Sequence, residues 1–412
     1  MQKSSLLNSN AQASRNTFLI LGIIFVAFTL RAPITSVGPL VSTIRDDIGM
    51  TNSEAGFITT LPLLAFAFLS PLAPRLSLKI GKEMTVLLAL IVLGIGIIIR
   101  STGMVSTLFL GTGIMGLGIA FSNVILPGIV KQSFPTRVGL MTGVYTVSMG
   151  TFAGIAPGVS APLAENFHMG WQGSLSVWIL IVLVGVIVWS PQIKKNKASS
   201  GSTLSVNHPS SSMLKSPLAW QVTLFMGLQS LIYFSFITWL PEMLYTQGIS
   251  ITAAGWMVAI FQFSGIPTGF LIPIIADRLP NQKPLAICIG ILCMTGLIGV
   301  LIGGPIILLT LFIICIGLGT GAALSLALTF IGMRAANAEQ AANLSGMAQS
   351  IGYFIAAFGP IALGFIFDLL HTWTLPLIFL IVVSIIMTFC GYGAGRDEYI
   401  FQMNMSDNQL NY

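Results

Sequence analysis

The amino-acid sequence predicts an all-α membrane protein whose twelve transmembrane helices form two similar six-helix bundles. Three observations carry this prediction: the composition is very apolar, uncharged runs of membrane-spanning length recur, and basic residues gather on one side of those runs. Of the 412 residues, 55% are hydrophobic and only 7% are charged, and the mean hydropathy is +0.91. A soluble protein carries about 25% charged residues. The composition therefore excludes a soluble enzyme and a nucleic-acid-binding module.

About 20 apolar residues cross the hydrocarbon core as a helix. Runs of that length are separated by polar joints or by joints that contain Pro and Gly. The predicted spans are 17–42, 54–76, 83–100, 104–130, 136–162, 172–191, 219–245, 252–276, 284–303, 305–333, 340–368 and 373–393.

The stretch between the sixth and seventh spans differs from the other joints. It is rich in Ser, Gly, Asn and Pro and contains four lysines, which is typical of a flexible linker. We therefore predict an N-terminal six-helix bundle over 1–191, a cytoplasmic linker over 192–218, and a C-terminal six-helix bundle with a cytoplasmic tail over 219–412.

The basic residues predict the orientation of the chain. Fifteen of the 18 Lys and Arg fall on one side of the predicted spans, Arg45 and Arg100 fall on the other, and Arg31 falls on neither. Positive residues are retained on the cytoplasmic side during insertion. Both termini are therefore expected in the cytoplasm.

Corresponding features recur in the two halves at a nearly constant separation. Gly116-Leu117-Gly118 matches Gly317-Leu318-Gly319 at an offset of 201, and Pro39 matches Pro241 at 202. Pro157 matches Pro360 at 203. Two duplicated halves are the construction of transporters that bind solute near the bilayer midplane and rock around it.

Several strings in the N-terminal half carry a resemblance to a known family. They are Leu30-Arg31, Thr59–Ala67, Ser70–Ala73, Gly118–Ala120, Asn123–Gly128 and Gly170–Gly173. In these strings the chain resembles the major facilitator superfamily, and within it the cyanate and nitroimidazole porter family. The resemblance implies a transporter fold and a small, often anionic solute.

The chain departs from two signatures of the superfamily that it resembles. The loop between the second and third spans has Leu78 where an acidic residue is usual, whereas the corresponding loop of the other half keeps Asp277 and Arg278. The arginine typical of drug/proton exchangers would fall at Thr112. This difference disfavours a drug exchanger.

Arg31 is the strongest functional signal, because it lies near the middle of the first span. An arginine at the bilayer centre costs roughly 2.5–3.5 kcal/mol, so it is expected to face a polar cavity. There its planar guanidinium would donate to an anionic or electron-rich solute. A structural interhelical hydrogen bond is the alternative. No Asp or Glu lies at mid-span, so a buried carboxylate for proton or cation transport has no candidate.

Helical spacing and the repeat predict neighbours for Arg31. Thr35 and Gly38 would share its helix face, at i+4 and i+7. The offset of 202 relates Arg31 to Tyr233, with Gln229 one turn away. These two could bind solute or could join helices.

Further residues complete the predicted site and its moving parts. Trp239 could form an aromatic wall or lie in the outer interfacial belt, and the belt is favoured. Additional predicted substrate-binding residues are Asn123, Tyr145, Gln262, Gln349 and Tyr353, and predicted gating or structural residues are Gly38, Pro62, Pro157, Asp277, Arg278, Pro241 and Pro360.

We therefore expect a secondary active or facilitative carrier for a small anionic or electron-rich polar solute, cyanate-like or nitro-heterocycle-like, in a bacterial inner membrane. The alternatives are an efflux carrier for neutral or hydrophobic compounds, in which Arg31 is structural, and a non-transporting receptor. No catalytic residues, metal, cofactor or nucleic-acid partner is expected. The partners are the solute and membrane lipid, and the chain is expected to act as a monomer.

Overall fold

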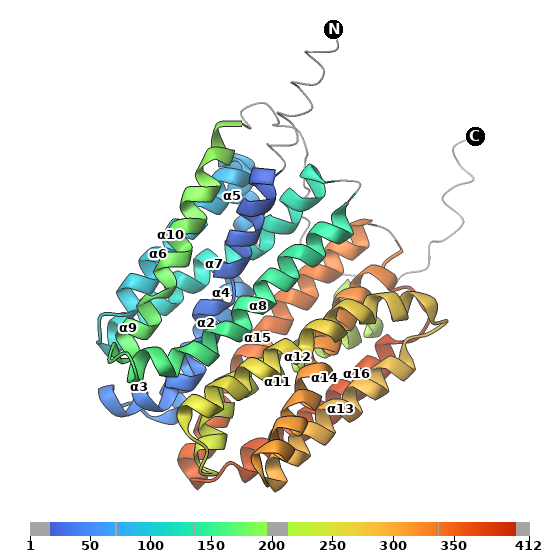
Figure 1. The fold of residues 1–412 in the computed structure, drawn as a ribbon. Coiled ribbons are helices and arrows are strands. Elements are labelled where there is room, and N and C mark those ends of the chain that lie inside the picture. Colours follow the sequence, from blue (N-terminus) through green and yellow to red (C-terminus); the bar gives the residue numbers. More distant parts are fainter. Residues whose placement is uncertain (1–16, 71, 135–136, 196–212, 337, 401–412) are drawn as a thin grey trace, which may run out of the picture. The chain divides into compact units, whose positions relative to one another are not determined.

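The computed structural model describes residues 17–70, 72–134, 137–195, 213–336 and 338–400. Within these ranges the regular structure is helical and contains no strand (Figure 1). Twelve segments are long and apolar enough to cross a membrane. The predicted number of spans is confirmed, and most predicted boundaries lie within three residues of the observed ones.

Most spans are single long helices, but the first and sixth are divided. The first consists of helical residues 17–29, α2 (Ala32–Thr35), η1 (Gly38–Leu40) and α3 (Val41–Ile48). The remaining elements are α4 (Asn52–Leu69), α5 (Leu72–Ile80), α6 (Lys82–Arg100), α7 (Val105–Ser133), α8 (Val138–Glu165), α9 (Gly170–Ser176), α10 (Trp178–Trp189), η2 (Ser190–Lys195), η3 (Met213–Lys215), α11 (Pro217–Tyr245), α12 (Ile251–Arg278), α13 (Lys283–Ile302), α14 (Ile306–Met333), α15 (Ala338–Leu370) and α16 (Thr374–Ala394).

Local sequence accounts for the sharp turn between α3 and α4. Gly49 ends α3 with a left-handed conformation (φ 69°), which glycine adopts without steric cost. Thr51 then begins α4 with a capping box, in which its hydroxyl accepts from the Glu54 backbone N–H and the Glu54 carboxylate accepts from the Thr51 N–H. These bonds satisfy amides that would otherwise lack partners at the helix start.

The chain divides into two compact units. The first comprises the described parts of Met1–Val206, Ser235–Phe263 and Pro360–His371, and the second those of Asn207–Phe234, Ser264–Gly359 and Thr372–Tyr412. Three helices, α11, α12 and α15, therefore contribute to both units. The predicted boundaries 1–191, 192–218 and 219–412 remain a prediction about the two halves, and residues 196–212 of the predicted linker lie outside the described residues.

Matching glycines produce matching helix contacts within each unit. In the first unit α7 packs against α6, and a Cβ on Gly118 would lie 2.5 Å from the Ala89 carbonyl oxygen. In the second unit α14 packs against α13, and a Cβ on Gly319 would lie 2.6 Å from Cys293 Sγ. Gly118 and Gly319 are one of the predicted repeat pairs. The repeat therefore preserves the places where two backbones approach closely.

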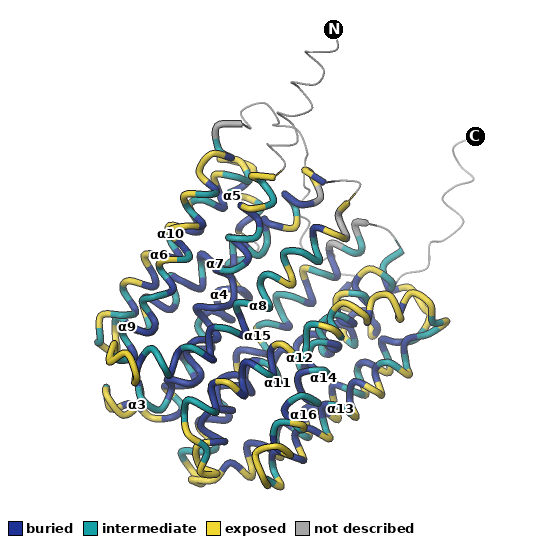
Figure 2. The backbone as a smooth tube through the Cα atoms, viewed as in Figure 1, coloured by how far each residue is buried: buried dark blue, intermediate teal, exposed yellow. Residues whose placement is uncertain are grey.

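The burial pattern separates a packed helix face from one that suits lipid. On α13 the buried positions include Ile289, Cys293 and Leu297, while Ile291 and Ile298 are exposed. Figure 2 shows this alternation of buried and exposed stripes along α13 and α16. Because the exposed stripe is as apolar as the buried one, α13 suits a position with hydrocarbon on one side and protein on the other.

We predict that Gly111→Ala destabilises the α6–α7 contact. A Cβ there would meet the backbone of Arg100 and of Gly96, so overpacking should cost about 1–3 kcal/mol. Gly113→Ala is the matched control on α7, because nothing lies within 4 Å of its Cβ position and alanine favours helix. Thermal melting in detergent should show a lower midpoint for Gly111→Ala only. Equal midpoints for the two variants would contradict the packing.

Candidate functional site

The first span is interrupted at the residue that the sequence singled out. Helical residues end at Thr29, Leu30 and Arg31 form a turn, and α2 begins at Ala32. Pro33 carries no N–H and cannot donate to the Thr29 carbonyl, which a continuous helix would require. Instead, the Leu30 N–H bonds three residues back, to the Ala27 carbonyl at 3.2 Å. A non-helical backbone therefore lies near the middle of the span Thr17–Ile48.

A second interruption follows directly after the four residues of α2. Ser36 and Val37 form another turn, and Pro39 cannot donate to the Thr35 carbonyl. The chain from Arg31 to Gly38 is therefore not one regular α-helix, and the shared i+7 face of these two residues stays a prediction.

Gly38 lies where another helix approaches the first span closely. A Cβ on Gly38 would meet the Ile237 carbonyl of α11. The Thr35 hydroxyl lies 3.3 Å from the Arg31 carbonyl oxygen, to which it donates. Thr35 thus helps to hold the backbone of Arg31.

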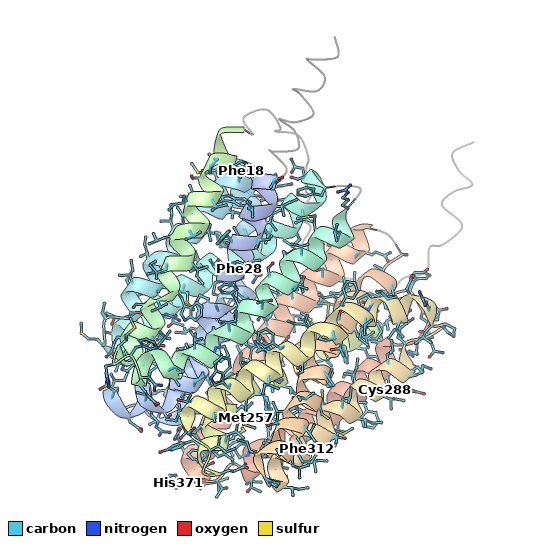
Figure 3. All side chains as sticks on the ribbon, viewed as in Figure 1. Phe18, Phe28, Met257, Cys288, Phe312 and His371 are labelled. Carbon is cyan, nitrogen blue, oxygen red and sulfur yellow. The ribbon has the colours of Figure 1, made fainter. Side chains whose placement is uncertain are left out.

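Arg31 itself is buried, with 9% of its surface exposed, and has a non-helical backbone (φ −122°, ψ −39°). Three residues earlier, Phe28 stacks on Phe152 of α8, with ring centroids 4.0 Å apart and an interplanar angle of 25°. Figure 3 marks Phe28 on the first helix of the first unit. A half-buried aromatic side chain that stacks on α8 thus lies three residues before the buried guanidinium at the interruption.

Two further arginines, Arg100 and Arg334, are more deeply buried than Arg31. The sequence analysis did not predict their burial. Arg100, assigned from sequence to the outer flank, is fully buried, and Arg334 is 2% exposed. Arg334 donates from Nε to the Ala394 carbonyl at 2.9 Å and from Nη2 to Gln282. Burial lowers the pKa of Arg334, and the charge of Asp397 opposes this effect. The sequence feature that could have indicated the burial of Arg100 is its position at the end of a long run without charged residues.

Arg100 contacts the interrupted part of the first span. Its Nη1 donates to the Pro33 carbonyl at 2.7 Å, and Pro33 is two residues from Arg31. The structure therefore brings a second cation to the segment that carries Arg31. Arg31 and Arg100 both belong to the first unit.

The other predicted residues of the first unit lie on three helices. Gln262 on α12 is buried, and its Nε2 lies 3.4 Å from the Ala153 carbonyl of α8. Tyr145 on α8 and Asn123 on α7 are half-buried. Gln262 thus joins two helices, as polar side chains do inside membrane proteins.

The remaining predicted residues belong to the second unit. Gln229 is buried and donates to Ser230 Oγ at 2.7 Å, and Tyr233 packs edge-on against Phe234. Gln349 donates to Ser345 Oγ at 2.9 Å, and Tyr353 is half-buried. Both of these hydrogen bonds join residues of the same helix. The role of Gln229 and Gln349 in binding solute, and that of Tyr233 and Tyr353, stays a prediction.

A polar cluster ties together four helices of the first unit. We call Arg45, Asn52, Glu242 and Asp368 the Arg45 cluster. Arg45 Nη1 donates to Asn52 Oδ1 at 2.7 Å and to Glu242 Oε1 at 3.2 Å. Asp368 accepts from the backbone N–H of Asn52 at 3.1 Å and of Ser53 at 2.8 Å, and from Asn52 Nδ2 at 2.7 Å. The cluster joins α3 and α4 to the ends of α11 and α15.

Glu242 is the buried carboxylate that the sequence analysis did not anticipate. It is 6% exposed and lies in the last turn of α11. Its position near the helix end agrees with the sequence, but its burial depends on chain segments distant in sequence. Asp47 beside the cluster accepts from Trp171 Nε1 at 2.8 Å.

The predicted gating prolines of the first unit lie at close helix contacts. The Pro360 carbonyl of α15 accepts from Trp239 Nε1 at 2.8 Å and faces Gly56 of α4. Trp239 is fully buried, so its expected place in the interfacial belt is wrong. Its indole lies inside the packed unit because Gly364 gives it room.

Pro157 and Pro62 lie at close helix contacts of the same kind. The Pro157 carbonyl would lie 2.7 Å from a Cβ on Gly255, and Pro62 Cα would lie 2.7 Å from a Cβ on Gly116. Pro241 is buried within α11. Asp277 and Arg278 are exposed at the end of α12. Whether any of these residues gates transport stays a prediction.

The structure also has a hollow away from the predicted binding residues. It has a volume of about 310 Å³ and is lined by Ser53, Glu54, Phe57, Phe109 and Ile361. Across the described ranges, no group of three or more His, Cys, Asp or Glu could hold a metal ion.

The fold and the buried polar groups are those of a polytopic membrane transporter. The profile of the Major Facilitator Superfamily matches residues 19–360, and the chain belongs to this superfamily. Within it, the chain belongs with the cyanate and nitroimidazole porters, as the strings in the N-terminal half indicated. Members of this superfamily are transporters and not enzymes.

Three relatives match along most of their length. The chain is 47% identical to the uncharacterized transporter YycB of Bacillus subtilis (strain 168), covering 95% of this chain and 96% of the relative. It is 41% identical to the 2-nitroimidazole transporter of Escherichia coli (strain K12), covering 93% and 96%. Identity to the cyanate transport protein CynX of the same organism is 26%, covering 83% and 88%.

A solved structure supports the fold alone. The D-xylose-proton symporter has a TM-score of 0.72 at 13% identity, covering 92% of this chain and 96% of the symporter chain. Together with the twelve apolar helices, the bacterial relatives support a multi-pass inner-membrane protein.

We predict that Asp368→Ala weakens the Arg45 cluster and lowers stability. The first-turn amides of α4 would lose a partly buried carboxylate acceptor, and hydrogen bonds to charged groups contribute about 1.5–3 kcal/mol each. Asp46→Ala is the control, because Asp46 pairs with Arg45 on the exposed surface. Melting in detergent should shift clearly for Asp368→Ala and little for Asp46→Ala. The reverse order would be incompatible with the cluster as described.

Proposed function

We propose that this carrier moves a small anionic or electron-rich polar solute, which Arg31 binds. The observation that carries the proposal is the placement of Arg31: a buried guanidinium on non-helical backbone near the middle of a membrane-spanning segment. Irregular backbone at membrane depth occurs where it is buried in protein or lines a water-filled cavity. Transporters use such interruptions at their solute sites.

The local charge supports an electron-rich solute. Arg100 of α6 contacts the carbonyl two residues after Arg31, so a second cation lies against the short segment that carries Arg31. The buried carboxylate Glu242 pairs instead with Arg45, outside this segment. A positive site of this kind favours a compact anion, or a neutral group whose oxygen or nitrogen atoms accept parallel N–H donors.

The relatives support the same chemical class. One is named a 2-nitroimidazole transporter and another a cyanate transport protein. A nitro group and a cyanate ion are both small and rich in acceptor electrons. Phe28, three residues before Arg31, forms a half-buried stack with Phe152. Aromatic rings of this kind would suit a flat heterocycle.

The proposed transport cycle uses alternating access around Arg31. The Arg45 cluster lies at the end of the molecule that the basic-residue pattern assigns to the outside. Its bonds between α3–α4 and the ends of α11 and α15 would break when solute enters or leaves there. Thr35, Asn123, Tyr145, Gln262, Gln229, Tyr233, Gln349 and Tyr353 remain proposed contributors to binding. Cytoplasmic termini and a monomeric state belong to the same proposal.

We predict that Arg31→Ala abolishes most transport. Proteoliposomes containing the purified protein would be assayed with 2-nitroimidazole and with cyanate. Loss of a charge-assisted pair of hydrogen bonds should reduce the ratio of maximal rate to KM by at least about tenfold. Arg31→Lys should retain part of the activity, because it keeps the charge but not the planar pair of donors.

Arg396→Gln is the matched control, because this arginine lies in the second unit and outside the predicted site. It should transport like the wild type. Full retention of transport by Arg31→Ala would reject the proposal and favour the carrier for neutral or hydrophobic compounds, in which Arg31 is structural.

A further inference from the structure

Arg100 is an unusual group for the end of a transmembrane helix. It is fully buried, and one of its five N–H groups is directed from Nη1 at the Pro33 carbonyl. Its Nε and Nη2 are also buried and have no hydrogen-bond partner among the described residues. No carboxylate of the described ranges pairs with it. Burying a guanidinium without a charged partner is energetically costly. The one hydrogen bond of Arg100 among the described residues, to the Pro33 carbonyl, is therefore expected to have a role.

Helix packing explains how Arg100 reaches this position. Gly111 of α7 lies against the backbone of Arg100, so the two helices approach closely where α6 ends. The C-terminal end of a helix carries partial negative charge, which stabilises a cation there. The end of α6 thus holds a positive side chain inside the first unit.

The acceptor is a product of the interrupted first span. In a continuous helix the Pro33 carbonyl would accept from the Val37 N–H. Here Val37 donates to the Ile34 carbonyl at 3.4 Å, because the chain turns at Ser36 and Val37. The Ser36 hydroxyl reaches the Pro33 carbonyl only at 3.3 Å, whereas Arg100 reaches it at 2.7 Å. Arg100 therefore supplies the strong donor that the helix has lost.

We propose that Arg100 is a positioning residue for the Arg31 site. Its hydrogen bond to Pro33 holds the short helix α2, which follows directly after Arg31. It thereby sets the direction in which the Arg31 side chain leaves the backbone. The Arg31 carbonyl is held from the other side by the Ile34 and Thr35 N–H groups, each at 3.0 Å. This inference rests on the proposed function for its effect on solute, but its structural part can be tested without solute.

The first test is hydrogen–deuterium exchange of the purified protein without solute. Arg100→Met removes the donor at similar side-chain length, and Arg100→Lys keeps a donor and a positive charge. In Arg100→Met, amides of residues 34–37 should exchange about fivefold to tenfold faster, as expected when a stabilising hydrogen bond is lost locally. Arg100→Lys should stay near the wild type, and amides of α13 should not change in either variant. Unchanged exchange in Arg100→Met would overturn the proposal.

Transport kinetics form the second test, with 2-nitroimidazole as the probe. Positioning predicts that Arg100→Met raises KM about tenfold and that Arg100→Lys restores it to within about threefold of the wild type. An unchanged KM with faster exchange would show a structural bond only. A raised KM with normal exchange would show direct contact with solute. Either result would overturn positioning.

Two further variants separate the possible failures. If Arg100→Met does not fold, Arg100→Gln is the milder replacement: it removes the charge and shortens the donor, so amides of residues 34–37 should exchange faster than in the wild type. Unchanged exchange in Arg100→Gln would overturn the inference. If Arg31→Ala transports normally while Arg100→Met still loosens residues 34–37, the proposed function fails but the structural role of Arg100 stands.

Discussion

The central constraint on this structure is that a polypeptide inside a bilayer must satisfy its own backbone hydrogen bonds. The simplest way to do so is a continuous α-helix. The first span departs from it, because Pro33 and Pro39 each remove a backbone N–H donor. The protein compensates with shorter-range backbone bonds and with the guanidinium of Arg100 on the Pro33 carbonyl. Arg31 occupies the turn that results, so the backbone interruption and the candidate site share one physical origin.

Close packing within the first unit complements that interruption. Glycines at positions such as Gly56 and Gly255 admit proline carbonyls of neighbouring helices, and the Trp239 indole is buried against one of them. The Arg45 cluster adds polar bonds at the same helix ends. Polar and steric contacts of this kind hold helices together in lipid, where the hydrophobic effect between helices is small.

Much of the architecture could be predicted because it follows from composition and periodicity. Twelve spans and the Gly118–Gly319 repeat pair depend on local sequence, and both agree with the helix contacts observed. The position of Arg31 near mid-span was predictable for the same reason. The turns at Leu30–Arg31 and Ser36–Val37 were not, since counting residues assumes a continuous helix and proline breaks it. Trp239 was misplaced because an aromatic residue near a helix end is compatible with either a lipid interface or a packed interior.

The sequence by itself determined the membrane class, the number of spans, the superfamily and the candidate cation Arg31, because insertion into lipid depends on local hydropathy and charge. Only the tertiary structure decided that Arg100 and Glu242 are buried and which groups they contact. Arg100 meets a carbonyl 67 residues away, and Glu242 meets an arginine 197 residues away. Such contacts depend on how helices pack, and hydropathy at a helix end does not distinguish a side chain that faces water from one that faces another helix.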